Sequence, residues 1–260
     1  MSRLCPLFSG SSGNSYYIGS RGAGVLIDAG RSARQLDGML RLCGIDPLAI
    51  QGVLVTHEHS DHISGLRVFA RKYGLPVYAS EGTLEAAKSQ LEGVDLRPIG
   101  EGTELGGMEI RPFPVSHDCL EPVGYRIHTA DGRNFCLGTD LGYLSPEVQE
   151  ALLGCDMVVI ESNHDVETLR NGPYPYHLKR RILSDKGHLS NEACAAFLPQ
   201  LLKSGVRRFL LAHLSRENNS PQLALNASLS ALVQGGYVQG VDFLLNVAPV
   251  ENSAGKTVIF

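Results

Sequence analysis

The chain has 260 residues, of which 43% are apolar, so it can build one large domain or two small ones around a sizeable core. Its formal net charge of −4 excludes a global basic field, so any polyanion must bind a local basic patch. Six scattered cysteines without a CxxC spacing argue against a cysteine zinc site and suit a reducing compartment.

The ends and overall organisation of the sequence favour a cytoplasmic protein. The first apolar run is too short for a signal peptide, and a Gly/Ser turn follows it. No apolar stretch approaches the length of a membrane span, so we expect no membrane association. No repeat, linker or low-complexity segment divides the chain. We therefore expect a single domain over residues 1–260, with an oligomeric state that the sequence does not define.

Five short apolar runs rich in Val, Ile, Leu and Phe are typical of buried strands. They span residues 25–27, 53–55, 135–137, 158–160 and 209–211. Each is followed within three residues by a group able to bind a metal or a proton, namely Asp28, His57, Asp140, Glu161 and His213. Because such residues gather at one rim of an α/β sheet, we expect the five side chains on the same side.

Helices alternate with these strands. Apolar residues three and four apart over 62–73 predict one helix that ends at Gly74. Ser190 is expected to cap a helix over 193–201, and Ser220 a helix that runs to 235–236. Asp131-Gly132 predicts a turn between strands at 125–127 and 134–136. The alternation indicates an α/β fold.

The run His57-Glu58-His59-Ser60-Asp61-His62 places three imidazoles and two carboxylates in six residues. His57 and His59 point the same way in an extended segment, whereas Asp61 and His62 begin the next helix and can face a second point. One strand-to-helix turn can thus supply two metal ions. The alternative is a polar loop that is His-rich by coincidence. Imidazole and carboxylate ligands suit two divalent ions, Zn²⁺ or Mn²⁺. Such a pair activates a water and stabilises charge on a phosphoryl or acyl oxygen.

This HxHxDH pattern after an apolar strand resembles the signature of metallo-β-lactamase-fold hydrolases, and the resemblance extends over nearly the whole chain. It implies a four-layer αβ/βα sandwich with mixed sheets. It also implies that Asp28 holds the His loop without touching metal. The ligands implied for one ion are His57, His59 and His117, and those for the other are Asp61, His62 and His213. Asp140 is implied to bridge the two ions, and with Asp61 it counts among the catalytic residues.

Each outlying residue also has a plainer interpretation. Alone, His117 would be a surface side chain, Asp140 a turn or cap residue, and His213 a core histidine. Their order and their places after strands favour the ligand interpretation. The remaining candidates are interpreted as structural or as chance neighbours of the site: Glu58 pointing away from the metals, Cys119 as a buried thiol, and His128, His164 and His177.

The choice of substrate rests on other residues, because a fold alone does not define one. Glu161 and the Gly187–Asn191 loop resemble an acidic residue and a His in the nuclease branch that contains tRNase Z-like and RNase J-like enzymes. The resemblance implies that His188 assists the leaving group and that Glu161 orients it, with a milder loss expected on removal of Glu161. A His⁺ backed by a carboxylate can do this chemistry. The alternative is a capping segment around Ser190.

Further polar residues are candidates for binding phosphates. Lys179 and Arg181 belong to the densest basic cluster, although such runs are more often solvated helix faces. Ser11 and Asn14 lie in a Gly/Ser turn that could hold a phosphate or could be a simple hairpin turn. Two more candidates follow His213, namely Ser215 and Asn218.

Four stretches resemble the YycJ-like (WalJ-like) subgroup: residues 9–14, 174–181, 187–191 and 213–218. The resemblance implies a 5′-to-3′ exonuclease acting on DNA, with a 5′-phosphorylated end and a role in repair. The interval from Asp140 to His213 is too short for a β-CASP insertion. The main alternative is a small-molecule hydrolase such as a cyclic phosphodiesterase, lactonase or thioesterase. A non-catalytic metal-binding protein is disfavoured because no ligand position is lost.

Overall fold

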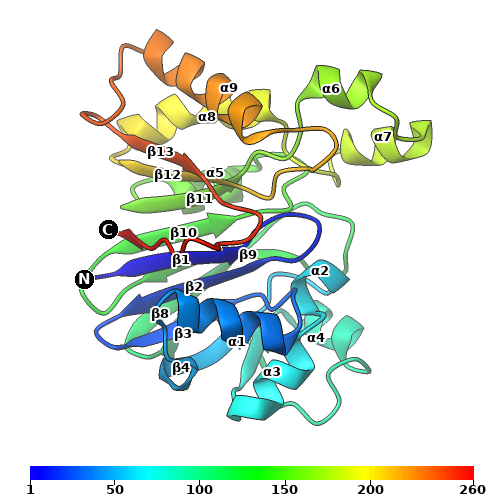
Figure 1. The fold of residues 1–260 in the computed structure, drawn as a ribbon, viewed down its shortest axis with the longest axis vertical. Helices are drawn as coiled ribbons and strands as arrows, with labels where there is room; N and C mark the ends of the chain where they lie inside the picture. The colour runs from blue at the N-terminus through cyan, green and yellow to red at the C-terminus, as the bar shows by residue number, and fades with distance from the viewer. The chain divides into compact units, whose positions relative to one another are not determined.

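The computed structural model describes all residues from Met1 to Phe260. It divides into two compact units, each with its own helices and strands (Figure 1). Each unit also has its own hydrophobic core. The first unit comprises residues 1–112, 119–133 and 249–260, and the second comprises residues 113–118 and 134–248. The strands belong to two mixed sheets flanked by helices. No helix combines the length and the apolar character that crossing a membrane requires.

The first unit contains a seven-stranded sheet in the order β14-β1-β2-β3-β4-β5-β6. Its strands are β1 (Arg3–Phe8), β2 (Ser15–Ser20), β3 (Ala23–Ile27), β4 (Ile50–Leu54), β5 (Val77–Ala79), β6 (Leu96–Pro98) and β14 (Val258–Ile259). Strands β3 to β6 pair in parallel, so β3 and β4 end at the same edge. Outside this sheet lie β7 (Thr103–Leu105), its antiparallel partner β8 (Met108–Pro114), and β9 (Val123–His128).

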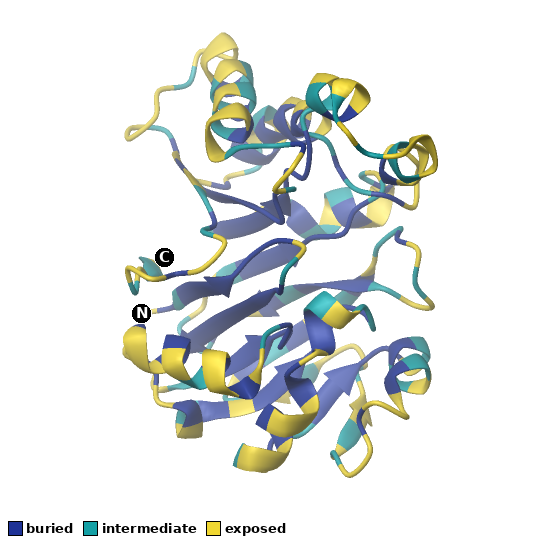
Figure 2. Ribbon diagram, turned by 45° about the vertical axis from the view of Figure 1, so that its right-hand side comes forward, coloured by how far each residue is buried: buried dark blue, intermediate teal, exposed yellow.

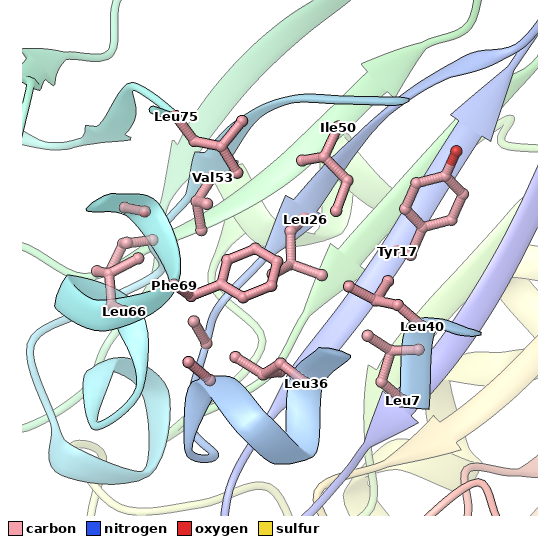
Figure 3. Packing of buried hydrophobic residues seen from close by; sticks show 14 of the residues in the cluster. Leu7, Tyr17, Leu26, Leu36, Leu40, Ile50, Val53, Leu66, Phe69 and Leu75 are labelled. Carbon is pink, nitrogen blue, oxygen red and sulfur yellow. The ribbon is translucent and has the colours of Figure 1, made fainter. Parts of the chain in front are cut away.

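Helices α1 (Ala33–Leu42) and α3 (Leu66–Tyr73) place their apolar side chains in the core of the first unit. Leu36 and Leu40 are four apart on α1 and are fully buried, and Phe69 of α3 is fully buried as well. These side chains meet Leu26 and Tyr17 from the sheet (Figure 3). The unit also contains η1 (Pro47–Ala49), α2 (Ser60–Ile63) and α4 (Glu81–Ala87).

The prediction of one continuous helix over 62–73 is wrong, because the chain forms α2 and then α3 with a break between them. Gly65 lies so close to the preceding loop that an added Cβ would be 1.7 Å from the Arg31 carbonyl oxygen. The Gly65 N–H donates to the Ala29 carbonyl at 2.9 Å. This contact turns the backbone, and only tertiary packing reveals it. The predicted end at Gly74 is confirmed, with φ of 64°.

In the second unit four neighbouring strands are parallel: β10 (Asn134–Gly138), β11 (Met157–Glu161), β12 (Arg208–Ala212) and β13 (Leu244–Val247). Its helices are α5 (Pro146–Leu152), α6 (Val166–Asn171), α7 (Tyr176–Ile182), α8 (Asn191–Lys203) and α9 (Pro221–Gln234). Helices α8 and α9 lie side by side (Figure 1). The predicted caps Ser190 and Ser220 are confirmed.

Parallel pairing decides where the predicted site residues lie. In the first unit Asp28 and His57 follow β3 and β4 at one edge, and in the second unit Asp140, Glu161 and His213 are at one edge as well. The prediction that strand-end residues share a rim is therefore confirmed within each unit.

Candidate metal centre

The first unit gathers its predicted ligands around the carboxylate of Asp28. Oδ1 accepts the Thr56 N–H at 2.8 Å, and Oδ2 accepts the Thr56 hydroxyl at 2.9 Å. His62 Nδ1 lies 2.8 Å from the same Oδ2, and both side chains are buried. A proton on Nδ1 leaves the Nε2 lone pair available as a ligand. Asp28 therefore contacts the loop at Thr56 and orients the ring of His62 through Nδ1.

The other residues of the His loop lie beside His62. The ring centroids of His57 and His62 are 4.0 Å apart, and those of His57 and His59 are 4.6 Å apart. Asp61 Oδ2 lies 3.6 Å from His62 Nε2. This donor set of imidazole nitrogens and a carboxylate fits a divalent ion such as Zn²⁺ or Mn²⁺.

Asn14 supports this loop from the Gly/Ser turn. It is buried, its Oδ1 accepts the Gly10 N–H at 2.8 Å, and its Nδ2 lies 3.1 Å from His62 Nε2. The segment after β3 also approaches this loop closely, because a Cβ added at Gly30 would lie 1.7 Å from the Asp61 carbonyl oxygen. Asn14 thus contacts predicted ligands, whereas Ser11 in the same turn is exposed.

The second unit is organised around Glu161, which is fully buried. Its Oε1 lies 2.9 Å from His188 Nδ1 and 2.9 Å from His213 Nδ1. Its Oε2 accepts the backbone N–H groups of Leu141 and Leu189 at 2.7 and 3.1 Å. Burial alone would raise the pKa of Glu161, but the charges of His188 and His213 and the hydrogen bonds to these two rings hold its pKa well below the ordinary value. The expected Glu161–His188 contact is present, and His213 is a second partner that the sequence did not suggest.

Asp140 lies beside the same histidines. Its Oδ1 is 3.5 Å from His213 Nδ1, 3.6 Å from His188 Nδ1 and 3.8 Å from His117 Nε2. Burial lowers the pKa of His117, which favours the neutral ring that a metal ligand requires. Its Nδ1 faces the Gly187 carbonyl at 3.0 Å, which leaves Nε2 on the side of Asp140. His117, Asp140 and His213 are therefore assembled within one unit.

Three of the predicted site residues have left-handed backbone: Asp28 at φ 60°, Asp140 at 57° and His213 at 56°. This conformation costs most non-glycine residues about 1–2 kcal/mol, and Asp and His are among the side chains that tolerate it best. Such strain clusters at functional sites, where the surrounding structure imposes it. Each of the three residues lies just after a strand, where the left-handed backbone changes the direction of its own side chain relative to the side chains of the strand.

Sequence reasoning missed an asparagine network that holds three loops of the second unit together. The Asn163 side chain donates to the His213 carbonyl at 2.8 Å. Asn191 Oδ1 accepts the Ser162 hydroxyl at 2.6 Å and the Asn219 amide at 2.9 Å. Two members, Asn191 and Asn219, lie in the stretches 187–191 and 213–219 that the sequence singled out for their chemistry, and this was the available signal.

Four candidates for phosphate binding make contacts inside the second unit. Lys179 Nζ donates to the carbonyls of Arg170 and Gly172, both at 2.7 Å, at the end of α6. Arg181 Nη2 donates to Asp118 Oδ1 at 2.9 Å. The other two contact each other, because the Ser215 hydroxyl accepts the N–H of the fully buried Asn218 at 3.2 Å.

The residues set aside as structural have varied environments. His128 and His177 are exposed, and Glu58 Oε1 accepts the Leu120 N–H at 2.8 Å. Cys119 is half-buried, so the expectation of a buried thiol is wrong. His164 is buried in the second unit, and neither ring nitrogen has a hydrogen-bond partner.

Comparison with known proteins identifies the fold and the family of this chain. Residues 24–214 match the family described as Beta-lactamase superfamily domain. YhfI of Bacillus subtilis, a metallo-beta-lactamase fold protein, aligns with a TM-score of 0.71 at 16% identity, covering 96% of this chain and 97% of that one. Zn²⁺-bound PqqB of Methylobacterium extorquens aligns with a TM-score of 0.70 at 16% identity, covering 99% and 100%. The expected fold class, an α/β sandwich with mixed sheets, is confirmed.

Two curated relatives cover most of the chain. Exodeoxyribonuclease YycJ of Bacillus anthracis is 40% identical over 242 residues, 91% of each chain. Exodeoxyribonuclease WalJ of Streptococcus pneumoniae serotype 2 (strain D39 / NCTC 7466) is 41% identical over 244 residues, covering 91% of this chain and 90% of that one. The chain belongs to the β-lactamase superfamily and, within it, to the family of the YycJ and WalJ proteins. It is accordingly a metal-dependent hydrolase.

Proposed function

We propose that the chain is a two-metal exodeoxyribonuclease that shortens DNA in the 5′-to-3′ direction from a 5′-phosphorylated end. The relatives named exodeoxyribonucleases support a DNA substrate, since they span 91% of the chain at 40–41% identity. The observation that carries the proposal is the 2.9 Å contact between Glu161 and His188. The contact fixes the His188 ring through Nδ1 and places beside it the carboxylate that supports a proton donor to a leaving alkoxide.

The ligand set is the one that the sequence predicts. His57, His59 and His117 would hold one ion, Asp61, His62 and His213 would hold the other, and Asp140 would be shared. The geometry within each unit supports this assignment, because Asp28 faces Nδ1 of His62 and Glu161 faces Nδ1 of His213, leaving Nε2 as the ligand atom in both. When bound, Zn²⁺ or Mn²⁺ would lower the pKa of a water and stabilise charge on the phosphoryl group.

His188 is the proposed proton donor. Its Nδ1 faces Glu161, so Nε2 is the atom that can meet a substrate, and the side chain is 15% exposed. A proton moves from Nε2 to the leaving alkoxide oxygen as the P–O bond breaks. Glu161 remains ionised and stabilises the imidazolium before the transfer. Asp61 and Asp140 would act as charged ligands that keep the ions in place.

A substrate panel tests this function. Protein loaded with Zn²⁺ or Mn²⁺ is incubated with 5′-phosphorylated DNA, the same sequence as RNA, a bis-aryl phosphodiester, a thioester and a β-lactam. DNA labelled at its 3′ end should shorten progressively from the other end. Hydrolysis of the thioester with no DNA cleavage would contradict the proposal and favour a small-molecule hydrolase.

A further inference from the structure

One face of α7 has no role in the proposed chemistry and is exposed. Tyr176, Arg180 and Leu183 lie at positions i, i+4 and i+7, which places them along one side of the helix. Tyr176 is 76% exposed and Leu183 is 44% exposed. Much of the ribbon of α7 has the yellow of exposed residues in Figure 2. The intervening Ile182 is buried, so the helix is anchored by a different side. We refer to Tyr176, Arg180 and Leu183 as the α7 face.

The basic residues of α7 divide into two groups. Lys179 donates to carbonyls at the end of α6, and Arg181 pairs with Asp118. The Arg180 guanidinium, in contrast, has no carboxylate partner and lies over the Tyr176 ring at 5.9 Å from its centroid. This arrangement presents a flat aromatic ring and a planar cation together. Single-stranded nucleic acids bind such surfaces by stacking bases on the ring while the cation contacts phosphate or base.

The segment around α7 carries a net positive charge, which is complementary to a polyanion. Residues 173–186 contain four basic residues and one acidic residue, although the chain as a whole has a net charge of −4. Lys186, at the end of this segment, is exposed. The segment is therefore a local basic patch of the kind that an acidic protein needs in order to bind DNA.

Helix α7 is also tied to the proposed proton donor. The Ile182 carbonyl at its end accepts the His188 N–H at 3.0 Å. Arg181 holds Asp118, the neighbour of His117. Tyr176 lies at the opposite end of the helix, about 9 Å from Ile182 along the axis. A base stacked there would belong to a nucleotide a short distance along the strand from the phosphate at His188.

We propose that the α7 face is a stacking platform for an unpaired base of the substrate strand, with Tyr176 and Arg180 as the residues that grip it. This inference rests on the proposed function, because it assumes a DNA strand at His188. Stacking needs a free base face but no particular base. The platform therefore selects single-stranded DNA, or a frayed end, with little dependence on sequence.

A fluorescence experiment tests the contact directly, because the chain contains no tryptophan. Tyr176→Trp introduces a single indole on the α7 face, and Leu48→Trp places a matched indole at a 74% exposed position of the first unit. Single-stranded DNA titrated into metal-loaded protein should quench the first variant saturably and leave the second unchanged. Equal behaviour of the two variants, at DNA concentrations that wild-type protein cleaves, would overturn the platform.

Kinetics separate this inference from the proposed function. Tyr176→Ala should raise KM for single-stranded DNA by about 5- to 100-fold, the scale of one lost base stack, with little change in kcat. Tyr176→Phe should retain the wild-type KM, and all variants should hydrolyse a bis-aryl phosphodiester normally. An unchanged KM in Tyr176→Ala overturns the platform alone. Wild-type protein that cleaves the aryl ester but no DNA overturns the nuclease and the platform together.

Discussion

Each unit contains one buried carboxylate that orients histidines, but the two carboxylates differ in how many they serve. In the first unit Asp28 faces a single imidazole, that of His62, and its other contacts go to Thr56. In the second unit Glu161 faces His188 and His213 at the same distance, 2.9 Å. Asp28 can therefore influence metal binding only, whereas Glu161 couples a proposed ligand to the proposed proton donor.

The backbone sharpens this contrast. Asp28 is itself left-handed, with φ of 60°, whereas Glu161 is the last residue of a regular strand and the strain lies on Asp140 and His213 beside it. Asparagine tolerates this conformation far better than alanine does. Substitutions at Asp28 and Asp140 are therefore most informative as asparagine, because the backbone is then preserved and only the chemistry changes.

The largest effect is expected for Asp140→Asn. Loss of the shared charge should remove metal and abolish turnover of every phosphodiester while the chain still folds. Asp140→Ala should be equally inactive but less stable by about 1–2 kcal/mol, because alanine is strained at positive φ. Metal analysis, cleavage assays and thermal unfolding measure these effects. Two bound ions and normal activity in Asp140→Asn would show that Asp140 is not a ligand.

Glu161→Gln should be the next most severe. The carboxylate faces four donors, and a glutamine amide must turn its NH₂ toward two of them in either orientation. Each unsatisfied buried donor costs about 1–3 kcal/mol. Cleavage of DNA and of an aryl phosphodiester should both fall, and metal affinity should drop by about 10- to 100-fold, because His213 loses its orientation.

The matched control is Glu167→Gln, which changes an exposed carboxylate of the same unit. It should leave metal affinity and both activities unchanged. The sequence suggested that loss of Glu161 would be milder than loss of His188, because it gave Glu161 one partner. Normal metal affinity in Glu161→Gln would show that loss of Glu161 is milder than loss of His188. It would also show that Glu161 does not serve a metal ligand, so the contrast with Asp28 would no longer hold.

His188→Ala should separate the two substrates. DNA cleavage should slow by about 10²–10⁴-fold, the usual contribution of a positioned acid. An activated aryl phosphodiester leaves without protonation, so its hydrolysis should decrease much less. Metal content should remain at the wild-type level, as it should in the control His128→Ala, which alters an exposed histidine. Loss of an ion in His188→Ala, with equal losses on both substrates, would identify His188 as a ligand.

These comparisons show which features a sequence can reveal. The caps at Ser190 and Ser220 are local, and the strand ends at Asp28 and Glu161 follow from apolar runs, so all four were predicted. The break at Gly65 was not, because it arises from contact with a loop more than thirty residues earlier in the chain.

The partners of individual side chains were likewise beyond the sequence. A basic run has the same composition whether its residues face solvent or make internal bonds, so nothing distinguished Arg180 from Lys179 and Arg181. The sequence also could not predict that His213 is the second partner of Glu161. The two residues are distant in the chain and meet through the parallel pairing of β11 and β12.

The smallest effect at the candidate centre is expected for Asp28→Asn, and it completes the contrast. Asparagine keeps the backbone and can still accept the Thr56 N–H through its Oδ1. Its NH₂ replaces Oδ2 and would donate to His62 Nδ1, which moves the ring proton to Nε2, the proposed ligand atom. Metal affinity should fall by about 10- to 100-fold.

Saturating metal should then restore cleavage of DNA and of the aryl phosphodiester to the same extent in Asp28→Asn, because the proton donor is unchanged. Titration of metal-stripped protein, followed by activity on both substrates, measures this. A selective loss on DNA that persists at saturating metal would show that Asp28 also acts on the leaving group, and the two carboxylates would no longer differ in kind.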